Sequence, residues 1–407
     1  MADVPVRLLL SIGVALAWVG APSRAQAGAF EVQGLGPEGV AEASARSARA
    51  EDGTAAYFNP GGLALGQGTS IGVAPIVSVS TLEAQGERLP FEEPLGIAVS
   101  ASGTVPLEGP LAGRIRLGFA GHFLPTRALR LLARAGDRAF QPYYDNRTQR
   151  LVVLPSLGVR ITRHLGIGAA VNVLAGVRGP ARLEAGATGA PEPRIDIDAN
   201  TVMAGVFGVR FDPTEGARVA LVVRQAFGIP MRIETTADVG GVPLVTNIET
   251  KRAMFDPLTV VLASSFDVGR ASFEIDTAWH QWSAWEGPFL SVRSTLPGVN
   301  LGSRPIGRLF RDVVSLRIAS SVRFDLGKQR TLVLRAGAGG EPTMMTSAPQ
   351  GRTNLVDGDK LTVGLGATLV LTNVLAKALR IGLGGNGQFV SAAGSLFSTS
   401  LGVGVDL

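Results

Sequence analysis

Few residues of this chain could carry out catalysis or bind a metal. Cysteine is absent, and the only histidines are His122, His164 and His280. None of them has a second ligand at a spacing such as H-x-x-x-H, and none has an evident Ser-His partner. Without cysteine the chain also lacks disulfides, thiolate metal ligands and a thiol nucleophile. We therefore predict that the protein is not an enzyme and holds no metal.

A glycine motif near the N-terminus offers the other candidate chemistry. Gly34-x-Gly36-x-x-Gly39, with Glu51 and Asp52 downstream, matches the dinucleotide-binding fingerprint. That fingerprint requires a buried strand before it, because the pyrophosphate lies at the N-terminus of the helix that follows the strand. Only a leader-like segment precedes this one. A second match, Gly382-x-Gly384-x-x-Gly387, falls inside an expected strand, so we predict no cofactor.

The composition excludes two further classes. The 407 residues carry a formal net charge of +5 and 17% charged residues, and arginine is spread along the chain rather than gathered in runs. This distribution gives no indication of nucleic-acid binding. No apolar stretch reaches about 18 residues, so membrane-spanning helices are not expected. The length fits several soluble domains or one large barrel.

The first 27 residues have the pattern of a cleavable export signal. Arg7 precedes the apolar stretch 8–20, and Ala25-Gln26-Ala27 forms an A-x-A cleavage site. The alternative is a transmembrane anchor, but a stretch of about 13 residues is too short to span a bilayer. We expect the mature protein to begin near Gly28.

From Thr69 onward, apolar residues recur at every second position, as in strands that separate an apolar phase from a polar one. Val314, Leu316 and Ile318 alternate with Ser315 and Arg317. Such segments are about ten or more residues long, enough to cross a membrane when tilted. Strands of soluble proteins are shorter, at about five or six residues. The alternation itself does not say which face is outward.

Fourteen segments of this kind can be marked, an even number as in bacterial outer-membrane barrels. Short connections such as 212–215 alternate with long ones at 126–148, 179–196, 228–255, 284–311 and 342–358, which is typical of periplasmic turns and external loops. A soluble β-sandwich is the alternative. The segments are 69–83, 94–106, 112–125, 149–162, 164–178, 197–211, 216–227, 256–267, 270–283, 312–325, 329–341, 359–372, 377–391 and 395–407.

Two connections carry further expectations. Within 126–148, leucines and alanines alternate with arginines in the pattern of a short amphipathic helix that could cover an external mouth. At 279–283, His280 stands between Trp279 and Trp282 at a strand end, which predicts an interfacial girdle position. The enzymatic alternative is an outer-membrane lipase in which one of the histidines acts in catalysis.

Residues 28–67 have a different texture, rich in glycine and alanine, and they resemble the N-terminal hatch of the FadL family of outer-membrane long-chain fatty acid transporters. The matching features are Phe30, Gly34-Leu35-Gly36, the alanine-rich stretch, Glu51-Asp52 and Asn59-Pro60. Gly61 stands where the family usually has alanine. Further resemblance lies in 118–125, a glycine-rich third strand ending in Pro125, and in 279–283. The chain ends in Leu407, where such barrels usually have an aromatic residue.

The resemblance implies an all-β fold, a 14-stranded antiparallel transmembrane β-barrel with a small N-terminal helical hatch. It implies three parts: a signal peptide at 1–27, a hatch inside the barrel at 28–67, and the barrel at 68–407. The function implied is passive uptake of long-chain fatty acids or similar hydrophobic compounds across the bacterial outer membrane, with lateral release. Expected partners are that ligand, outer-membrane lipid and the barrel-assembly machinery, and we expect a monomer.

Site residues follow from the same resemblance and from the expected lumen face. Phe30 would touch ligand from the hatch, and the glycine-rich strand would form a lateral opening near Gly118, Gly121 and Pro125. Arg317, Arg323 and Arg335 lie on faces expected to point into the lumen, where each could bind a ligand carboxylate or pair with a structural acid. Gly34, Gly36, Asn59 and Pro60 make the hatch motif. The competing functions are a structural or adhesive barrel and a general porin for polar solutes.

Overall fold

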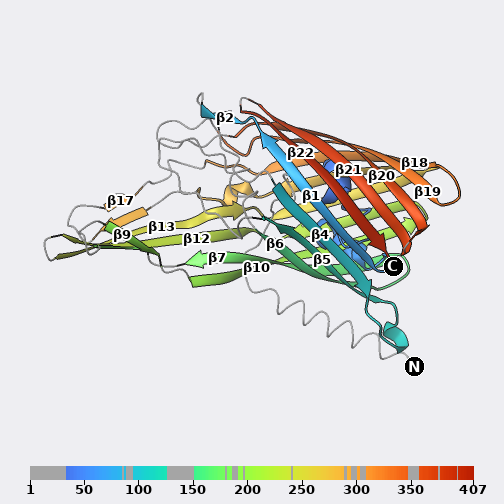
Figure 1. Ribbon diagram of the computed structural model, residues 1–407, viewed down its shortest axis with the longest axis horizontal. Coiled ribbons are helices and arrows are strands. Elements are labelled where there is room, and N and C mark those ends of the chain that lie inside the picture. Colours follow the sequence, from blue (N-terminus) through green and yellow to red (C-terminus); the bar gives the residue numbers. More distant parts are fainter. Residues whose placement is uncertain are drawn as a thin grey trace.

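Fourteen antiparallel strands form one closed barrel in the computed structural model of the chain (Figure 1). The structure describes residues 34–84, 87–88, 95–125, 151–178, 181–185, 191–195, 198–239, 242–287, 291–294, 300–302, 309–346, 357–374, 376–391 and 393–407. The barrel strands are β1 (Ser70–Ser80), β4 (Leu95–Thr104), β5 (Ile115–Phe123), β6 (Val152–Arg160), β7 (Leu165–Arg178), β10 (Asp198–Thr214), β11 (Ala217–Arg224), β14 (Thr259–Val268), β15 (Ala271–His280), β18 (Val313–Asp325), β19 (Arg330–Glu341), β20 (Lys360–Val374), β21 (Ala376–Val390) and β22 (Gly394–Asp406).

The barrel closes where the first strand meets the last. Ser70 pairs with Asp406 and Ser80 with Leu396 across β1 and β22, and every other barrel strand pairs with the next one along the chain. The number of strands and their antiparallel order confirm the fold predicted from the alternation. Each predicted segment overlaps one of these strands, with bounds that differ by a few residues.

Several segments predicted as loops contain further strands, so the sequence interpretation was wrong there. β12 (Phe227–Val239) and β13 (Val242–Asp256) form a long hairpin, which joins β16 (Ser291–Ser294) and β17 (Asn300–Gly302) in a four-stranded sheet. The hairpin extends away from the barrel on the side opposite the C-terminus (Figure 1). Two small sheets pair β2 (Glu83–Ala84) with β3 (Glu87–Arg88), and β8 (Ala181–Ala185) with β9 (Pro191–Ile195). The amphipathic helix predicted within 126–148 lies outside the described residues.

The outside of the barrel is apolar, which settles the question that the alternation left open. On β18, Val314 and Leu316 are 53% and 51% exposed, whereas Ser315 between them is 1% exposed. An apolar belt facing outward with small and polar residues inward is the arrangement of a membrane barrel and the reverse of a soluble one. Among the described residues, no helix is both long and apolar enough to cross a membrane.

A helical hatch fills part of the lumen. It comprises α3 (Gly36–Ala41), α4 (Ala55–Phe58) and α5 (Pro60–Leu63), with proline in the first turn of α3 and α5, where its missing N–H costs nothing. Helix α3 lies against β19 to β22 and β1, and α5 lies against β5, β6, β7 and β10. The hatch therefore reaches from one side of the barrel to the other, as its blue ribbon in Figure 1 shows.

The hatch approaches the wall backbone to backbone. A Cβ on Gly364 of β20 would lie 2.6 Å from the carbonyl oxygens of both Val40 and Ala41 in α3. Any larger residue at this position would displace the helix, because atoms do not approach so closely without strain. The glycine content of the strands thus serves docking of the hatch as well as the pleat of the wall.

The apolar belt makes a direct prediction about insertion. Leu365 is 66% exposed near the middle of β20. An arginine there would lie in hydrocarbon, so Leu365→Arg should destabilise the folded barrel by about 2–4 kcal/mol. Urea unfolding in lipid vesicles measures the change. Thr362→Arg, which adds the same charge on the lumen face of the same strand, is the control, and an equal loss in both variants would contradict the assignment of the faces.

Candidate functional site

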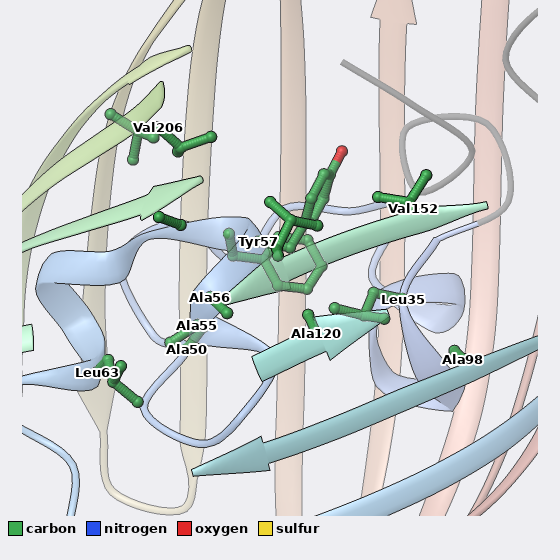
Figure 2. Close-up of a cluster of buried hydrophobic side chains, with 14 of the residues drawn as sticks. Leu35, Ala50, Ala55, Ala56, Tyr57, Leu63, Ala98, Ala120, Val152 and Val206 are labelled. Carbon is green, nitrogen blue, oxygen red and sulfur yellow. The ribbon is translucent and has the colours of Figure 1, made fainter. Parts of the chain in front are cut away.

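An apolar cluster lies inside the barrel against the hatch, and we call it the inner cluster. Figure 2 shows hatch residues Ala50, Ala55, Ala56 and Tyr57 between wall residues Val152 and Val206. Ile76, Val222 and Phe227 are each no more than 1% exposed. The full cluster is Leu35, Ala50, Ala55, Ala56, Tyr57, Phe58, Leu63, Ala74, Ile76, Ala98, Ala120, Val152, Leu154, Ala170, Ala204, Val206, Val222, Phe227, Val261 and Ala278.

The inner cluster occupies one side of the lumen only. Its wall residues come from β1, β4, β5, β6, β7, β10, β11, β14 and β15, which are neighbours around the barrel, and none come from β18 to β22. On that second side many of the buried inward residues are polar, including Ser315, Thr368 and Gln388, and buried apolar ones such as Val313, Val390 and Leu396 lie near one end of the strands. A small cavity there is lined mainly by polar residues, among them Arg317 and Lys360. The inner cluster therefore lies on one side of the lumen, beside buried polar groups of the same strands such as Arg224 and Glu274, and the opposite side is mainly polar.

A second apolar group, the outer cluster, lies at the end of the barrel opposite the C-terminus. Its centre is aromatic: the rings of Trp285 and Phe310 stack with centroids 4.5 Å apart, and Phe255 stacks on the other side of Trp285 at 5.8 Å. Offset stacking of this kind adds to the burial of apolar area. The cluster comprises Leu82, Phe255, Trp282, Trp285, Phe310, Val313, Met344, Met345, Val390, Ala393 and Leu396.

Both clusters reach the base of the β12–β13 hairpin, from opposite faces of its first pairs. Phe227 of the inner cluster starts β12, and Phe255 of the outer cluster pairs with its neighbour Gly228. Beside them, His280 is 1% exposed and its ring nitrogens lie 3.0 Å from the hydroxyls of Thr259 and Ser315. His280 is therefore buried inside the barrel, and its predicted girdle position at the lipid interface was wrong.

One guanidinium group enters the inner cluster without an acidic partner. Arg224, at the end of β11, is 4% exposed, and its Nη2 donates to the carbonyl oxygens of Tyr57 (2.8 Å) and Phe58 (3.3 Å). Its guanidinium carbon lies 4.8 Å from the centre of the Tyr57 ring, a cation–π contact. Its Nε is buried without a hydrogen-bond acceptor, and no carboxylate of the described residues pairs with it. A buried cation in apolar surroundings is a favourable place for an anion.

Ion pairs hold the hatch to the wall. Glu38 accepts from Arg46 of the hatch (2.7 Å) and from Arg335 of β19 (2.9 Å). Arg49 joins Glu42 of the hatch (3.1 Å) to Glu274 of β15 (2.6 Å). The Glu42 and Glu274 side chains are fully buried, so each charge depends on its partners to offset the loss of hydration.

These ion pairs set the protonation of the hatch carboxylates. Burial alone would raise the pKa of Glu38, but the guanidinium groups of Arg335 and Arg46 hold that pKa well below its usual range. Burial would raise the pKa of Asp52 as well, but Arg380 at 2.9 Å, Arg46 and the hydrogen bond from Thr54 together lower it. Both groups remain ionised at neutral pH, so the hatch is docked by charge.

The three predicted lumen arginines have different surroundings. Arg335 pairs with Glu38 and Glu42 of the hatch and also donates to the Thr368 hydroxyl of the neighbouring strand β20. Arg317 lines the cavity on the polar side of the lumen. Arg323 is exposed near the short-turn end of β18. None of the three belongs to the inner cluster, and Phe30 lies outside the described residues.

The hatch motif residues shape the hatch itself. Gly34 and Gly36 have φ values of +82° and +70°, which favour glycine. Asn59 caps α5 by accepting from the Gly61 N–H (2.9 Å) and donates to the carbonyl oxygen of Ser47 (2.9 Å), and Pro60 follows as the first residue of that helix. These backbone angles and hydrogen bonds give the motif residues a role in the local structure of the hatch.

The glycine-rich third strand is intact in this structure. β5 pairs without interruption with β4 from Arg116 to Phe123 and with β6 from Ile115 to His122. A Cβ on Gly118 would lie 2.7 Å from Leu63 of the hatch, so this glycine makes room for α5. Gly121 lies between the rings of Phe119 and Phe123, and Pro125 follows the strand. A lateral opening at this strand stays a prediction.

Arg224 and the two hatch arginines, Arg46 and Arg49, were missed by the sequence interpretation. Arg224 follows Ala220 and Val222 at period two on the lumen face, which is the signal that could have placed it. That signal is weak because the intervening residues Val219 and Leu221 are apolar as well. The hatch arginines stand in an irregular segment, where no periodicity indicates their surroundings.

A closed antiparallel barrel of fourteen strands, with an apolar exterior and an internal helical hatch, defines the class of plugged outer-membrane β-barrels. By sequence, neither a family model nor a curated protein matches the chain. By structure, a FadL homologue of Pseudomonas aeruginosa matches with a TM-score of 0.57 and 15% identity, over 91% of this chain and 98% of that one. The chain therefore has the FadL fold, as the hatch residues predicted.

Two channels with the same fold are also similar. The CymD monoaromatic hydrocarbon channel matches with a TM-score of 0.56 and 15% identity, over 92% of this chain and 97% of its own. The toluene transporter TodX of Pseudomonas putida matches with a TM-score of 0.56 and 15% identity, over 93% of this chain and 99% of its own. At these identities the similarity concerns the fold, and the site has to be argued from its own residues.

The charged docking of the hatch predicts that acid loosens it. Because the folded-state pKa of Glu38 is lowered, its ion pairs contribute fully above the unfolded-state value of 4.5, and the contribution is lost as pH falls from there toward the folded-state value. Cutting of the hatch of the purified protein by pepsin, divided at each pH by its cutting of an unfolded reference peptide, should therefore rise as pH falls below about 4.5. Glu38→Gln should be cut at higher pH.

Glu108→Gln, in an exposed turn, is the matched control and should behave like the parent. Heat-dependent mobility on gels, which reports the folded barrel, separates release of the hatch from global unfolding. A parent protein whose hatch is cut equally at every pH would show that these ion pairs do not dock it.

Proposed function

We propose that the protein takes up long-chain fatty acids or similar hydrophobic compounds through the outer membrane, by passive transport and with release into the membrane. The observation that carries this proposal is the succession of two apolar clusters, one at the mouth and one in the lumen of a plugged barrel. A structure named as a monoaromatic hydrocarbon channel and one named as a toluene transporter share the fold, which supports a hydrophobic cargo.

The physical argument is one of solvation. Each methylene that leaves an apolar site for water costs about 0.8 kcal/mol, so a long acyl chain cannot be released into a wet lumen at a useful rate. Apolar residues in series let the chain exchange one buried site for another. The hatch across the lumen is consistent with gating and argues against a steady pore for polar solutes.

The remaining parts of the proposal follow from the chain's organisation. We take residues 1–27 as a signal peptide, 28–67 as the hatch and 68–407 as the barrel, exported and inserted by the barrel-assembly machinery among outer-membrane lipids. The expected unit is a monomer, since one chain closes the barrel by itself. Phe30 would add an aromatic contact for ligand from the hatch.

Uptake into cells or liposomes tests this function directly. Oleate or a long alkylbenzene should enter faster with the protein than without it, whereas a sugar should not. Removal of residues 28–32, which include Phe30, should slow entry without changing the heat stability of the barrel. Equal entry of sugar would support a general porin instead, and no entry of any compound would support a structural barrel.

Arg224 favours a carboxylate-bearing cargo. A fatty acid that fills the inner cluster could place its carboxylate at the guanidinium group, whose Nε lacks an acceptor. Hydrogen bonds to charged groups contribute about 1.5–3 kcal/mol, so Arg224→Gln should weaken oleate binding roughly 10- to 100-fold. Binding of an alkylbenzene of similar length should not change, because it offers no anion.

The matched control is Arg116→Gln, which removes a buried lumen guanidinium outside the inner cluster. Arg224→Lys, which keeps the charge, should restore part of the affinity. If Arg224→Gln weakened the two ligands equally, the role of Arg224 would be to hold α4 through the Tyr57 and Phe58 carbonyls, and the choice of a fatty acid over a hydrocarbon would lose its support.

A further inference from the structure

The wall of the barrel is interrupted where it closes. β1 and β22 pair from Ser70↔Asp406 to Val73↔Val403 and again from Ile76↔Ser400, but Ala74 and Pro75 pair with no residue of β22. Proline has no N–H to give to a ladder, and in hydrocarbon a backbone group has no water to replace a lost partner. This seam is therefore easier to separate than the continuous ladders beside it.

A cavity lies directly behind the seam. It is lined by 72–74 of β1, 402–404 of β22 and 35–38 of the hatch. One hatch residue blocks it: a Cβ on Gly402 would lie 2.7 Å from the Pro37 ring, and a Cβ on Gly382 would lie equally close to it. The hatch thus closes the seam through Pro37, and a small movement of α3 would open it.

The cavity is continuous with the inner cluster. Leu35, Ala74 and Ala98 belong to both, so apolar surface runs from the lumen to the seam. Charged groups stand at the other edge of the cavity, where Asp52 and Asp406 pair with Arg380 at 2.9 Å each. An acyl chain gains nothing by passing these ion pairs toward water, and it remains in apolar surroundings if it turns toward the wall.

A second interruption provides a natural comparison. β6 and β7 do not pair at Leu154 and Pro155, although they pair on both sides of that point. Here hatch backbone covers the wall nearby, since a Cβ on Gly158 would lie 2.7 Å from the backbone nitrogen of Ala64. Both interruptions occur at a proline, Pro75 and Pro155. Of these two, only the one between β1 and β22 has a cavity lined by its own strands.

From these observations we infer that hydrophobic cargo leaves the barrel between β1 and β22, through the interruption at Pro75, when Pro37 withdraws from Gly402. This inference rests on the proposed function and gives it an exit. The exit differs from the opening that resemblance predicts at Gly118 and Gly121, because β5 is paired on both sides throughout.

Paired cysteines test the exit, since the chain contains no cysteine of its own. Val73→Cys with Val403→Cys places thiols on partner residues beside the interruption. Oxidation should abolish oleate uptake, and a reductant should restore it. The matched control is Val153→Cys with Val173→Cys, beside the interruption between β6 and β7, where oxidation should leave uptake unchanged.

A single substitution repeats the test without a cross-link. Pro75→Val supplies the missing N–H and should slow oleate uptake, whereas Pro155→Val should not. Heat-dependent gel mobility confirms that each variant folds. Unchanged uptake with the β1–β22 pair cross-linked, or equal loss with both pairs, would overturn the exit while the parent's uptake still supports the proposed function. Absence of oleate uptake by the parent would instead sink the function.

Discussion

The structure depends on the rule that no backbone N–H or C=O can remain unpaired in hydrocarbon. A single sheet satisfies the rule only by closing on itself, which brings β1 against β22 and encloses a lumen. Fourteen strands enclose more space than wall side chains can fill. The hatch occupies that space, and its close backbone approach to the wall is possible because glycine stands at positions such as Gly364.

The same enclosure accounts for the charges. A hatch made of short helices leaves polar groups in the lumen, and buried carboxylates such as Glu42 and Glu274 need cations beside them. Arg49 meets both, and Arg335 links Glu38 to the wall. Docking by charge rather than by apolar packing keeps the hatch separable from the barrel, whereas the apolar contacts of α4 and α5 place its other end in the inner cluster.

The sequence predicted the barrel well because lipid requires an apolar residue at nearly every outward position of each strand. On β18 to β22 the outward residues are apolar and most of the inward ones are small or polar, so period two is plain, as at Val314, Ser315 and Leu316. On β11 both faces are apolar, with Leu221 outward and Val222 inward, and the alternation is too weak to reveal an apolar lumen. The alternation of apolar and polar residues therefore predicted the strands of the wall but not the candidate site.

Other differences have their own physical reasons. His280 was placed at the correct strand end, but a strand turns successive side chains to opposite faces, and its parity points it inward. The β12–β13 hairpin pairs outside the wall, where no membrane enforces a pattern. The roles of Arg335 and Arg224 depend on which hatch residue stands opposite, a fact of tertiary structure that spacing along one strand does not contain.

The inner cluster lies on one side of the lumen and mainly polar residues on the other, and this arrangement bears on how water moves when an apolar molecule passes. In a channel of uniform width and polarity, an apolar molecule that advances must displace the water in front of it. In the transport that we propose, the two sides of the lumen would remove that resistance, because water could return past Arg317 and Gln388 while the ligand moves past Val152 and Val222. The hydrophobic ligand and the displaced water then need not follow the same path.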